Sequence, residues 1–417
     1  MTRPSAAPHA LWPDDLLDVA ALRAAGSRPL PFREFVVKVH SRCNLACAYC
    51  YVYEGADQLW REQPRTMSRH TAETVCRRVA EHARAHRTAS LRVILHGGEP
   101  LLAGPDFLRA FTRTLRALLP AATAAEILIQ TNGVLVDDTV LRLCHEEDIR
   151  IAVSLDGPRE VHDRARRDHA GRGSHARVAA VLRRLSSAEH RPVWAGLLCT
   201  VDVTADPLAV YEHLLSYDPP AIRLLLPLGN WTHRPPERTA DPTRIPYAEW
   251  LTAVFDRWYH APGPPVRIAF FESILDLLLG GVTRTETIGG APSQLAVVDT
   301  DGALTLSDQL KSAYEGADRS GCDVHRHSFD ALLDHPGVAA RQLTATGLAA
   351  PCRDCPVGAV CGGGHYPHRY RAGSGYLNPS VYCPDLMALI RHVAGVLRAD
   401  LDRAAGAHPG PHPGAHR

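Results

Sequence analysis

The stretch SRCNLACAYCY at residues 41–51 contains three cysteines, Cys43, Cys47 and Cys50, in the spacing C-x3-C-x2-C. Three thiolates can bind three irons of a [4Fe–4S] cluster and leave the fourth iron without a protein ligand. Such an iron is open to another molecule, whereas four cysteine ligands saturate a cluster. Part of a zinc site is the alternative, with a fourth ligand such as His40. The stretch therefore predicts a metal centre, and an open iron–sulfur cluster is the favoured form.

Outward from this stretch, short β-rich runs alternate with longer segments of helical periodicity as far as about residue 227. The predicted strands are 34–40, 91–96, 126–130, 149–154, 193–201 and 221–226, and helices are predicted at 69–86, 107–118 and 247–259. The apolar run at 266–280 is compatible with a buried strand or a helix. Strand–helix alternation predicts a parallel sheet with crossover helices. Six units are fewer than the eight of a closed barrel, so the expected fold class is α/β with an open, partial (β/α)6 barrel.

Four short motifs follow the predicted strands directly. Cys43 follows the first strand, and Gly97-Gly98-Glu99-Pro100 follows the second. Thr131-Asn132-Gly133 follows the third strand, and Ser154 ends the fourth. Since the C-terminal ends of parallel strands are where chemistry gathers in such folds, we expect these residues to share one site.

The cysteine spacing and the Gly97–Pro100 motif together resemble the signature of the radical S-adenosylmethionine (radical SAM) enzymes. The resemblance implies that SAM chelates the open iron and is cleaved reductively to a 5′-deoxyadenosyl radical. It also implies that the SAM-binding residues are Tyr49, Gly97, Gly98, Glu99, Pro100, Asn132, Ser154 and Arg166. A guanidinium suits the SAM carboxylate because it donates bidentate, charge-assisted hydrogen bonds. A purely structural turn remains the alternative for Asn132, and a solvated face is expected for Arg164, Arg167 and Arg172.

A second cysteine set lies near the other end of the chain, at Cys352, Cys355, Cys361 and Cys383. Its C-x2-C-x5-C run with a distant fourth cysteine is compatible with a four-cysteine zinc site. It resembles the SPASM domain, a C-terminal extension of peptide-modifying radical SAM enzymes that holds two auxiliary [4Fe–4S] clusters. The resemblance implies that these four cysteines ligate one auxiliary cluster.

The cysteines for the other auxiliary cluster are missing. Two of the family's cysteine positions are occupied here by Ser307 and His365, and no cysteine lies between Cys199 and Cys322. We therefore expect a single auxiliary cluster, and whether Cys322 or His365 ligates a cluster stays open. The remaining cysteines, Cys76, Cys144 and Cys199, are expected in the core, where free cysteine is common.

In the same family pattern, Asp308 directly follows the cysteine position that Ser307 occupies here. In anaerobic sulfatase-maturating enzymes an Asp there acts as the general base, so the resemblance implies a catalytic role for Asp308. A positioned carboxylate can accept the proton that an arene loses when a carbon radical joins it. A turn Asp is the alternative.

A narrower resemblance runs over about residues 34–395. Residues 361–386, together with 224–227, 298–302 and 308–311, look like those of the FxsB-type radical SAM/SPASM peptide maturases. This implies a RiPP (ribosomal precursor peptide) substrate and a three-residue cyclophane, in which a ring carbon of Trp, Phe or Tyr is bonded to the Cβ two positions on. The implied path is abstraction of a Cβ hydrogen, addition to the ring, and loss of one proton and one electron, the electron passing to the auxiliary cluster.

Two alternatives remain. A thioether-forming (sactipeptide) or sulfatase-type SPASM maturase would use the same radical chemistry. A non-catalytic iron–sulfur or zinc scaffold would use none of it.

The length of 417 residues favours two domains. The expected segments are an N-terminal segment (1–32), a radical SAM barrel (33–235), a bridging region (236–290), a smaller SPASM-type domain (291–395), and a helix end with a disordered tail (396–417). A net charge of +1 provides no basic field for nucleic acid. No apolar run is long enough to span a membrane. No signal region follows Met1. We therefore expect a cytoplasmic oxidoreductase with SAM, two [4Fe–4S] clusters, a precursor peptide, and an electron donor such as flavodoxin or ferredoxin.

Overall fold

The computed structural model describes residues 11–406 except 264 and 284, and it contains a nine-stranded sheet in the order β6-β5-β4-β3-β2-β1-β7-β8-β9. The first six strands are parallel to their neighbours. They are β1 (Glu34–His40), β2 (Ser90–Gly97), β3 (Ala124–Thr131), β4 (Ile149–Ser154), β5 (Trp194–Thr200) and β6 (Ile222–Leu225). The predicted open, partial (β/α)6 barrel is confirmed. The predicted tail after residue 406 lies outside the described residues.

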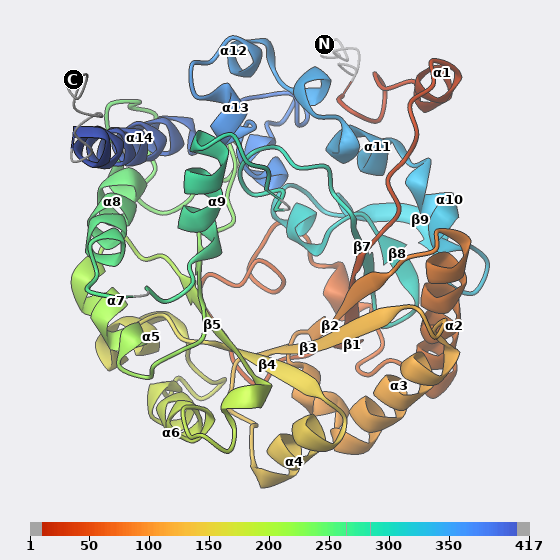
Figure 1. Cartoon of the computed structure of the whole chain (residues 1–417). Coiled ribbons are helices and arrows are strands. Elements are labelled where there is room, and N and C mark those ends of the chain that lie inside the picture. The colour runs from red at the N-terminus through yellow and green to blue at the C-terminus, as the bar shows by residue number, and fades with distance from the viewer. Residues whose placement is uncertain (1–10, 264, 284, 407–417) are drawn as a thin grey trace, which may run out of the picture.

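The crossover helices surround this sheet (Figure 1). Helix α2 begins after Ser68, whose side chain accepts a hydrogen bond from the Thr71 N–H and so caps the helix. The helices of the barrel are α2 (Arg69–Ala85), α3 (Pro105–Leu118), α4 (Asp138–Glu146), α5 (Arg159–Ala165), α6 (His175–Leu185) and α7 (Pro207–Leu215), with 3₁₀ turns η1 (Leu59–Arg61), η2 (Pro100–Ala103) and η3 (Arg191–Val193).

Most residues of β1 to β5 are buried or half-buried, and alternate residues point to opposite sides of the sheet. Residues such as Phe35 and Val37 of β1 belong to the main core, which also includes side chains of the surrounding helices. A second, smaller apolar cluster on the other face comprises Ile94, Leu128, Ala152 and Leu198, with Val36 packed against it. Lys38 and His96 lie one strand repeat farther along on that inner face and are register partners. The inner face therefore becomes polar towards the C-terminal ends of the strands.

The rest of the chain extends the same sheet. After α8 (Pro246–Tyr259) and α9 (Ala269–Leu278), which shows that the apolar run at 266–280 is helical, β7 (Leu295–Val298) pairs in parallel with β1. Strands β8 (Ala303–Thr305) and β9 (Arg319–Asp323) add antiparallel pairs. The other elements are α1 (Val19–Ala24), α10 (Phe329–Leu333), α11 (Pro336–Gln342), α12 (Ala350–Arg353), α13 (Gly358–Cys361) and α14 (Cys383–Gly406), with η4 (Asp308–Ser312), η5 (Ala345–Gly347) and η6 (Tyr366–Arg369).

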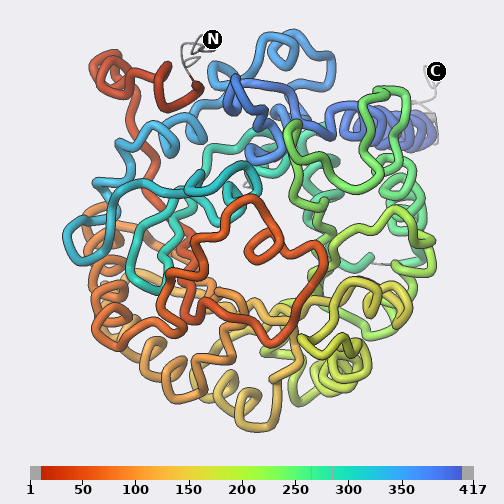
Figure 2. Tube along the Cα trace, turned by 180° about the vertical axis from the view of Figure 1, so that it is seen from behind, coloured from red at the N-terminus to blue at the C-terminus, as the bar shows by residue number. Residues whose placement is uncertain are grey.

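The segment that follows β1 crosses the centre of the ring of strands and helices, drawn red-orange in the view from behind (Figure 2). This segment contains the first cysteine set, Cys43, Cys47 and Cys50. In the residues that the structure describes, we find no helix with the length and apolar character needed to cross a bilayer.

Candidate functional site

The three N-terminal cysteines lie in the loop after β1, where each is half-buried. Burial raises the pKa of the Cys43 thiol to about 12, and the nearby Cys47 and Cys50 add to this shift. Burial also raises the pKa of Cys47 to about 11. These thiols therefore stay neutral on their own, and a bound metal is what would deprotonate them. Three half-buried thiols in one loop fit the predicted open cluster.

The Gly97–Pro100 motif packs directly on this loop. The Gly98 N–H donates to the His40 carbonyl at 2.9 Å, and the Glu99 N–H donates to the Arg42 carbonyl at 3.0 Å. A Cβ on Gly98 would lie 1.8 Å from Tyr53 Oη and 2.5 Å from the Arg42 carbonyl oxygen. The glycine is thus needed for contact between two protein segments, in addition to any approach of a ligand.

Glu99 joins the motif to the end of β3. Its fully buried carboxylate accepts hydrogen bonds from Thr131 Oγ1 at 2.8 Å and from the Asn132 N–H at 2.9 Å. Burial raises the pKa of Glu99 to about 7. Asn132 in turn directs its side-chain amide at Cys43, with Nδ2 at 3.6 Å from Sγ. The third strand end is therefore tied to the cysteine loop through this pair.

Arg166 is placed beside the cysteine loop by Asp156. Its Nε and Nη2 donate to the two carboxylate oxygens of Asp156 at 2.7 and 3.2 Å, and its guanidinium lies 5.4 Å from the centroid of the Tyr49 ring. Tyr49 Oη also donates to Asp156. Burial alone would raise the pKa of Asp156, but Arg166 holds it below its ordinary value. Arg166 is thus held in place by one bidentate partner, and within the described residues its Nη1 makes no hydrogen bond, so it can donate to another acceptor.

Asp308 is buried at the same end of the barrel, at the start of η4. Lys38 Nζ on β1 lies 2.7 Å from Asp308 Oδ1 and 3.1 Å from Asp299 Oδ2. Tyr51 Oη, one residue after Cys50, donates to Asp308 Oδ2 at 2.7 Å. Burial alone would raise the pKa of Asp308, but Lys38 and then Lys311 hold it well below its usual range. Asp308 is therefore an ionised carboxylate that contacts the residue following the cysteine motif.

The remaining predicted residues of this site also lie at strand ends. Pro100 begins η2 and is buried, and Ser154 ends β4 with 9% of its surface exposed. The structure therefore brings the predicted cysteines, the Gly97–Pro100 motif, Asn132, Arg166 and Asp308 to one end of the barrel.

The second cysteine set gathers where α12, α13 and α14 meet. Burial raises the pKa of Cys361 to about 12, with Cys383 and Cys352 as contributing neighbours. Burial likewise raises the pKa of Cys383, to which Cys352 and Cys355 contribute. The four thiols therefore lie close enough to influence one another. By contrast, Cys322 lies on β9 opposite Leu304, and Cys76, Cys144 and Cys199 are buried as predicted.

Within the described residues, neither cysteine set brings three thiols within 4.8 Å of one another. Thiolates on one tetrahedral zinc lie about 4 Å apart, because each Zn–S bond is about 2.3 Å. Across the described part of the chain, the group of three or more His, Cys, Asp or Glu ligand atoms lying within 4.8 Å of one another is His82, His86 and Asp330. An iron–sulfur cluster does not require thiolates this close together, because each thiolate binds a different iron.

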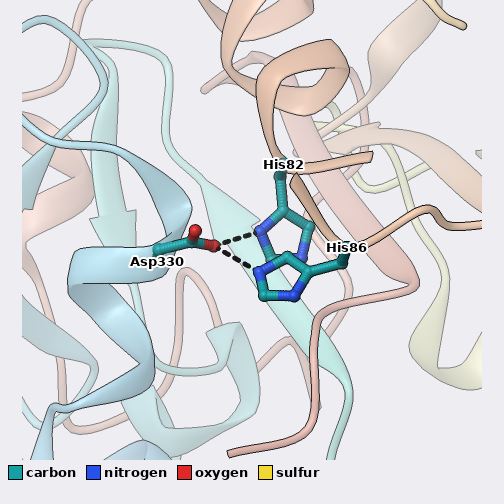
Figure 3. Close-up of side chains that lie close together, drawn as sticks. All are labelled: His82, His86 and Asp330. Carbon is teal, nitrogen blue, oxygen red and sulfur yellow. Dashed lines mark hydrogen bonds and ion pairs between the residues drawn. The ribbon is translucent and has the colours of Figure 1, made fainter. Parts of the chain in front are cut away.

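The group around Asp330 joins α2 to α10, with both histidines directed at the carboxylate (Figure 3). His82 Nδ1 and His86 Nε2 lie 2.6 and 2.9 Å from Asp330 Oδ1. His82 Nε2 accepts the buried Phe32 N–H at 3.0 Å, so the ring proton of neutral His82 sits on Nδ1. A metal at Nδ1 would move that proton to Nε2, against the Phe32 N–H. This group therefore joins α2 to α10 through hydrogen bonds, and we call His82, His86 and Asp330 the clasp.

The two positions where the family pattern has further cysteines are buried and lie near Arg341. Ser307 is 2% exposed and His365 is 7% exposed. Arg341 donates to the carbonyl of Leu306 at 2.5 Å and binds Glu286 at 2.6 Å. Burial lowers the pKa of His365 to about 3, and the charge of Arg341 contributes. An ion pair of buried Arg341 with half-buried Glu286 thus lies where the second auxiliary set is missing.

Sequence reasoning missed the partners that hold the predicted residues. A signal existed for Lys38, because a lone cation in the apolar run at 34–40 needs a buried counter-charge. Asp156 lies in the SLDG run after β4, where strand-end position was a hint. For the Lys38–Asp308 contact there was no local signal, since 270 residues separate the two.

Comparison with known proteins agrees with this geometry. Residues 37–213 match the model of the Radical SAM superfamily. The chain is 25% identical over 313 residues to the cysteine-type anaerobic sulfatase-maturating enzyme of Clostridium novyi, which covers 71% of this chain and 80% of the relative. It is also 25% identical over 390 residues to the serine-type anaerobic sulfatase-maturating enzyme of Klebsiella aerogenes, covering 90% and 92%.

Solved structures share the fold. The structure of anSMEcpe with bound AdoMet and the Cp18Cys peptide superposes with a TM-score of 0.75 at 21% identity, over 89% of this chain and 99% of that one. Streptococcus suis SuiB bound to the precursor peptide SuiA superposes with a TM-score of 0.58 at 13% identity, over 87% and 78%. The sequence match and the site geometry lead to one conclusion. Residues 37–213 of this chain match the Radical SAM superfamily, and the similarity to the Klebsiella sulfatase-maturating enzyme extends over 90% of the chain.

Proposed function

We propose that this chain is a peptide maturase that forms a carbon–carbon crosslink, a cyclophane, between an aromatic ring carbon and the Cβ of a nearby residue. Cys43, Cys47 and Cys50 would hold the first [4Fe–4S] cluster, and Cys352, Cys355, Cys361 and Cys383 the auxiliary one. The SAM site comprises Tyr49, Gly97, Gly98, Glu99, Pro100, Asn132, Ser154 and Arg166. When bound, SAM and the first cluster supply a radical that abstracts hydrogen.

The observation that carries the proposal is the contact between Tyr51 and Asp308. Because Tyr51 follows Cys50 directly, its hydrogen bond puts the Asp308 carboxylate beside the predicted cluster loop. Crosslinking removes one hydrogen atom from Cβ, and the ring then loses one proton and one electron as the new bond forms. Asp308 is ionised and can take the proton. The cluster that Cys352, Cys355, Cys361 and Cys383 would hold would supply an acceptor for the electron, which an external acceptor would then remove.

Lys38 has a defined part in this scheme. Its ammonium holds Asp308 ionised and fixes one carboxylate oxygen, so that Oδ2 faces Tyr51. The pair is almost completely buried, with side-chain exposures of 4% and 7%, so water does not screen it. Asp308 is thereby positioned as a proton acceptor with little freedom to rotate.

Sulfatase-type maturation is the second candidate, and the similarity to the Clostridium and Klebsiella enzymes favours it. Ser307 and His365, in place of two family cysteines, favour the crosslinking enzyme instead. We propose a cytoplasmic enzyme reduced by flavodoxin or ferredoxin and acting on a precursor peptide. The proposed division into a barrel (33–235), a bridging region (236–290) and a SPASM-type region (291–395) places the two cysteine sets in different parts.

The deciding experiment is anaerobic co-expression with short open reading frames from the same genomic neighbourhood that encode aromatic-x-x motifs. A crosslinked peptide loses two hydrogens, and tandem mass spectrometry shows no backbone fragments between the joined residues. Oxidation of serine to an aldehyde has the same mass change, so a hydrazide probe distinguishes it. Aldehyde labelling with complete fragmentation would replace the crosslinking proposal with the sulfatase-type one. The triple variant Cys43→Ala, Cys47→Ala, Cys50→Ala is the matched control and should leave the peptide unmodified.

A further inference from the structure

Arg369 lies inside the turn that follows the last cysteine of the C-x2-C-x5-C run. Gly362, Gly363 and Gly364 have φ angles of +60°, +77° and +68°, a left-handed run in which side chains are disfavoured. Their carbonyls turn towards Arg369, which donates from Nη2 to Gly362 at 2.8 Å and to Gly364 at 2.6 Å, and from Nε to Gly363 at 3.1 Å. A Cβ at Gly363 would lie 3.1 Å from the guanidinium carbon. The glycine turn is therefore shaped around this side chain.

This guanidinium is a buried cation without a carboxylate partner. Arg369 is 7% exposed, and within the described residues no carboxylate oxygen lies within 4.0 Å of it. Glu286, whose charge reaches Arg369, is bound by Arg341 at 2.6 and 2.9 Å. The three carbonyls solvate the guanidinium but carry no net charge. Buried charges are ordinarily paired, since an unpaired one is expensive.

The cysteines of the second set are the groups that can supply a negative charge to balance Arg369. Burial lowers the pKa of Arg369, and Tyr366, Cys361 and Cys352 counteract this because their ionised forms attract the guanidinium. The four thiols are themselves neutral without a metal. Once they are bound as thiolates around an iron–sulfur core, the assembly is a buried anion next to a buried cation.

We infer that Arg369 is the counter-cation of the auxiliary cluster, a positioning residue that favours its reduced state. The inference rests on the proposed function, since it requires a cluster at Cys352, Cys355, Cys361 and Cys383. Reduction adds one negative charge to the cluster, so a fixed unscreened cation makes reduction easier. Arg166, the corresponding cation near Cys47, is neutralised by Asp156. The cluster proposed to accept the substrate electron is thus the one with an unneutralised cation.

The test uses the full-length chain with Cys43, Cys47 and Cys50 replaced by alanine. The measured iron content and midpoint potential then belong to the C-terminal cluster alone. Arg369→Gln removes the charge, and Arg369→Lys keeps the charge but loses the fork of donors. Arg353→Gln is the matched control, because Arg353 is adjacent to Cys352 but exposed to solvent. Iron content is measured after anaerobic reconstitution, and the midpoint potential is measured by redox titration monitored by electron paramagnetic resonance.

We expect Arg369→Gln to shift the midpoint potential to a more negative value or to lose the cluster. Arg369→Lys should keep the cluster and shift its midpoint potential by less. Arg353→Gln should keep the cluster and leave the midpoint potential unchanged. Arg369→Gln with full iron and an unchanged potential would overturn the inference. The inference would also be overturned if Arg369→Lys lost the cluster as completely as Arg369→Gln. That result would show that the geometry of the donors matters and the charge does not. Failure of the proposed function looks different: without the auxiliary cluster the parent chain would hold no iron at the C-terminal set, and without crosslinking the peptide would show aldehyde labelling while the potentials were unaffected.

Discussion

Lys38 Nζ lies 2.7 Å from Asp308 Oδ1, and this buried ion pair joins the first barrel strand to the part of the chain that follows β8. Lys38 also contacts Asp299, so one cation serves two carboxylates. Burial alone would lower the pKa of Lys38, but Asp299 and Asp308 raise it above its ordinary value. Lys38 is therefore charged whenever the fold is intact, and the state of Asp308 depends on it.

Replacement of Lys38 by methionine should expose this dependence. Without the ammonium, burial raises the pKa of Asp308, so an acid limb should appear in the pH profile of crosslinking that the parent enzyme lacks above about pH 5. SAM cleavage, measured as 5′-deoxyadenosine, should persist. We also expect a loss of about 3–5 kcal/mol in stability, because two buried carboxylates lose the cation that they share. Tyr51→Phe removes one hydrogen bond to Asp308 and should move the acid limb of the pH profile by less than the Lys38 variant does. Profiles identical to the parent in both variants would show that Asp308 does not take the proton.

Gly98→Ala should disrupt the first cysteine loop and leave the second set intact. The new Cβ would meet the Arg42 backbone at 2.5 Å, which a side-chain movement cannot relieve. Iron after reconstitution should fall from about eight to about four per chain. The double variant Gly98→Ala, Tyr53→Phe should not recover it, since only one of the two contacts is removed.

Gly395→Ala is the control for this substitution. Gly395 lies in α14, and a Cβ added there would meet nothing within 4 Å, so alanine should be tolerated and even stabilise the helix by about 0.5–1 kcal/mol. Full iron and normal SAM cleavage in Gly98→Ala would contradict the packing argument.

Asp156→Asn should weaken SAM binding without loss of iron. The substitution removes the bidentate acceptor that orients Arg166 and leaves this cation buried without a counter-charge. We expect the dissociation constant for SAM to rise about tenfold or more, in line with the loss of a charge-assisted pair. Arg172→Gln is the control, since Arg172 is 78% exposed and pairs with Asp168 on the surface. An unchanged SAM affinity in Asp156→Asn would remove Arg166 from the SAM site.

These contacts show which parts of the molecule were predictable from the sequence. The strands at 34–40 and 149–154 were predicted to the residue, because apolar periodicity and flanking turns are local signals. The cysteine loop, the Gly97–Pro100 motif and Asn132 were expected together because parallel strands end at one edge. Asp308 was singled out by resemblance, but its partner Lys38 was not.

Other features depend on contacts that no local pattern records. The pairing of β7 with β1 joins segments about 260 residues apart and makes the C-terminal region an extension of the barrel sheet. The glycine run at 362–364 could be read as flexible, whereas Arg369 shows that it encloses a cation. Long-range pairing of this kind is decided by tertiary packing, which propensity and periodicity do not describe.

Measurement of the iron content should show which cysteine and histidine residues bind a cluster. Replacing Cys352, Cys355, Cys361 and Cys383 by serine should halve the iron from about eight to about four per chain while SAM cleavage persists. Cys322→Ser and His365→Asn should leave the iron content unchanged, because the four-cysteine set is complete without them. A loss of iron in either single variant would identify an additional ligand and would correct the four-cysteine assignment.

The clasp between α2 and α10 should weaken on acidification. Burial lowers the pKa of His82, although Asp330 opposes the shift. The folded state therefore disfavours protonated His82, so its contribution to stability is complete above about pH 6.5 and is lost as the pH falls below that value. The structural reason is that a second ring proton on Nε2 would face the Phe32 N–H.

The thermal unfolding midpoint should consequently drop between about pH 7.5 and pH 5.5. His82→Gln should make this dependence less steep, whereas His86→Gln, at a more exposed position, should preserve it. Added zinc should leave the midpoint unchanged in all three proteins, because a metal at His82 Nδ1 would cost the buried Phe32 hydrogen bond. A zinc-dependent rise in the midpoint that disappears in His82→Gln would instead make this group a metal site.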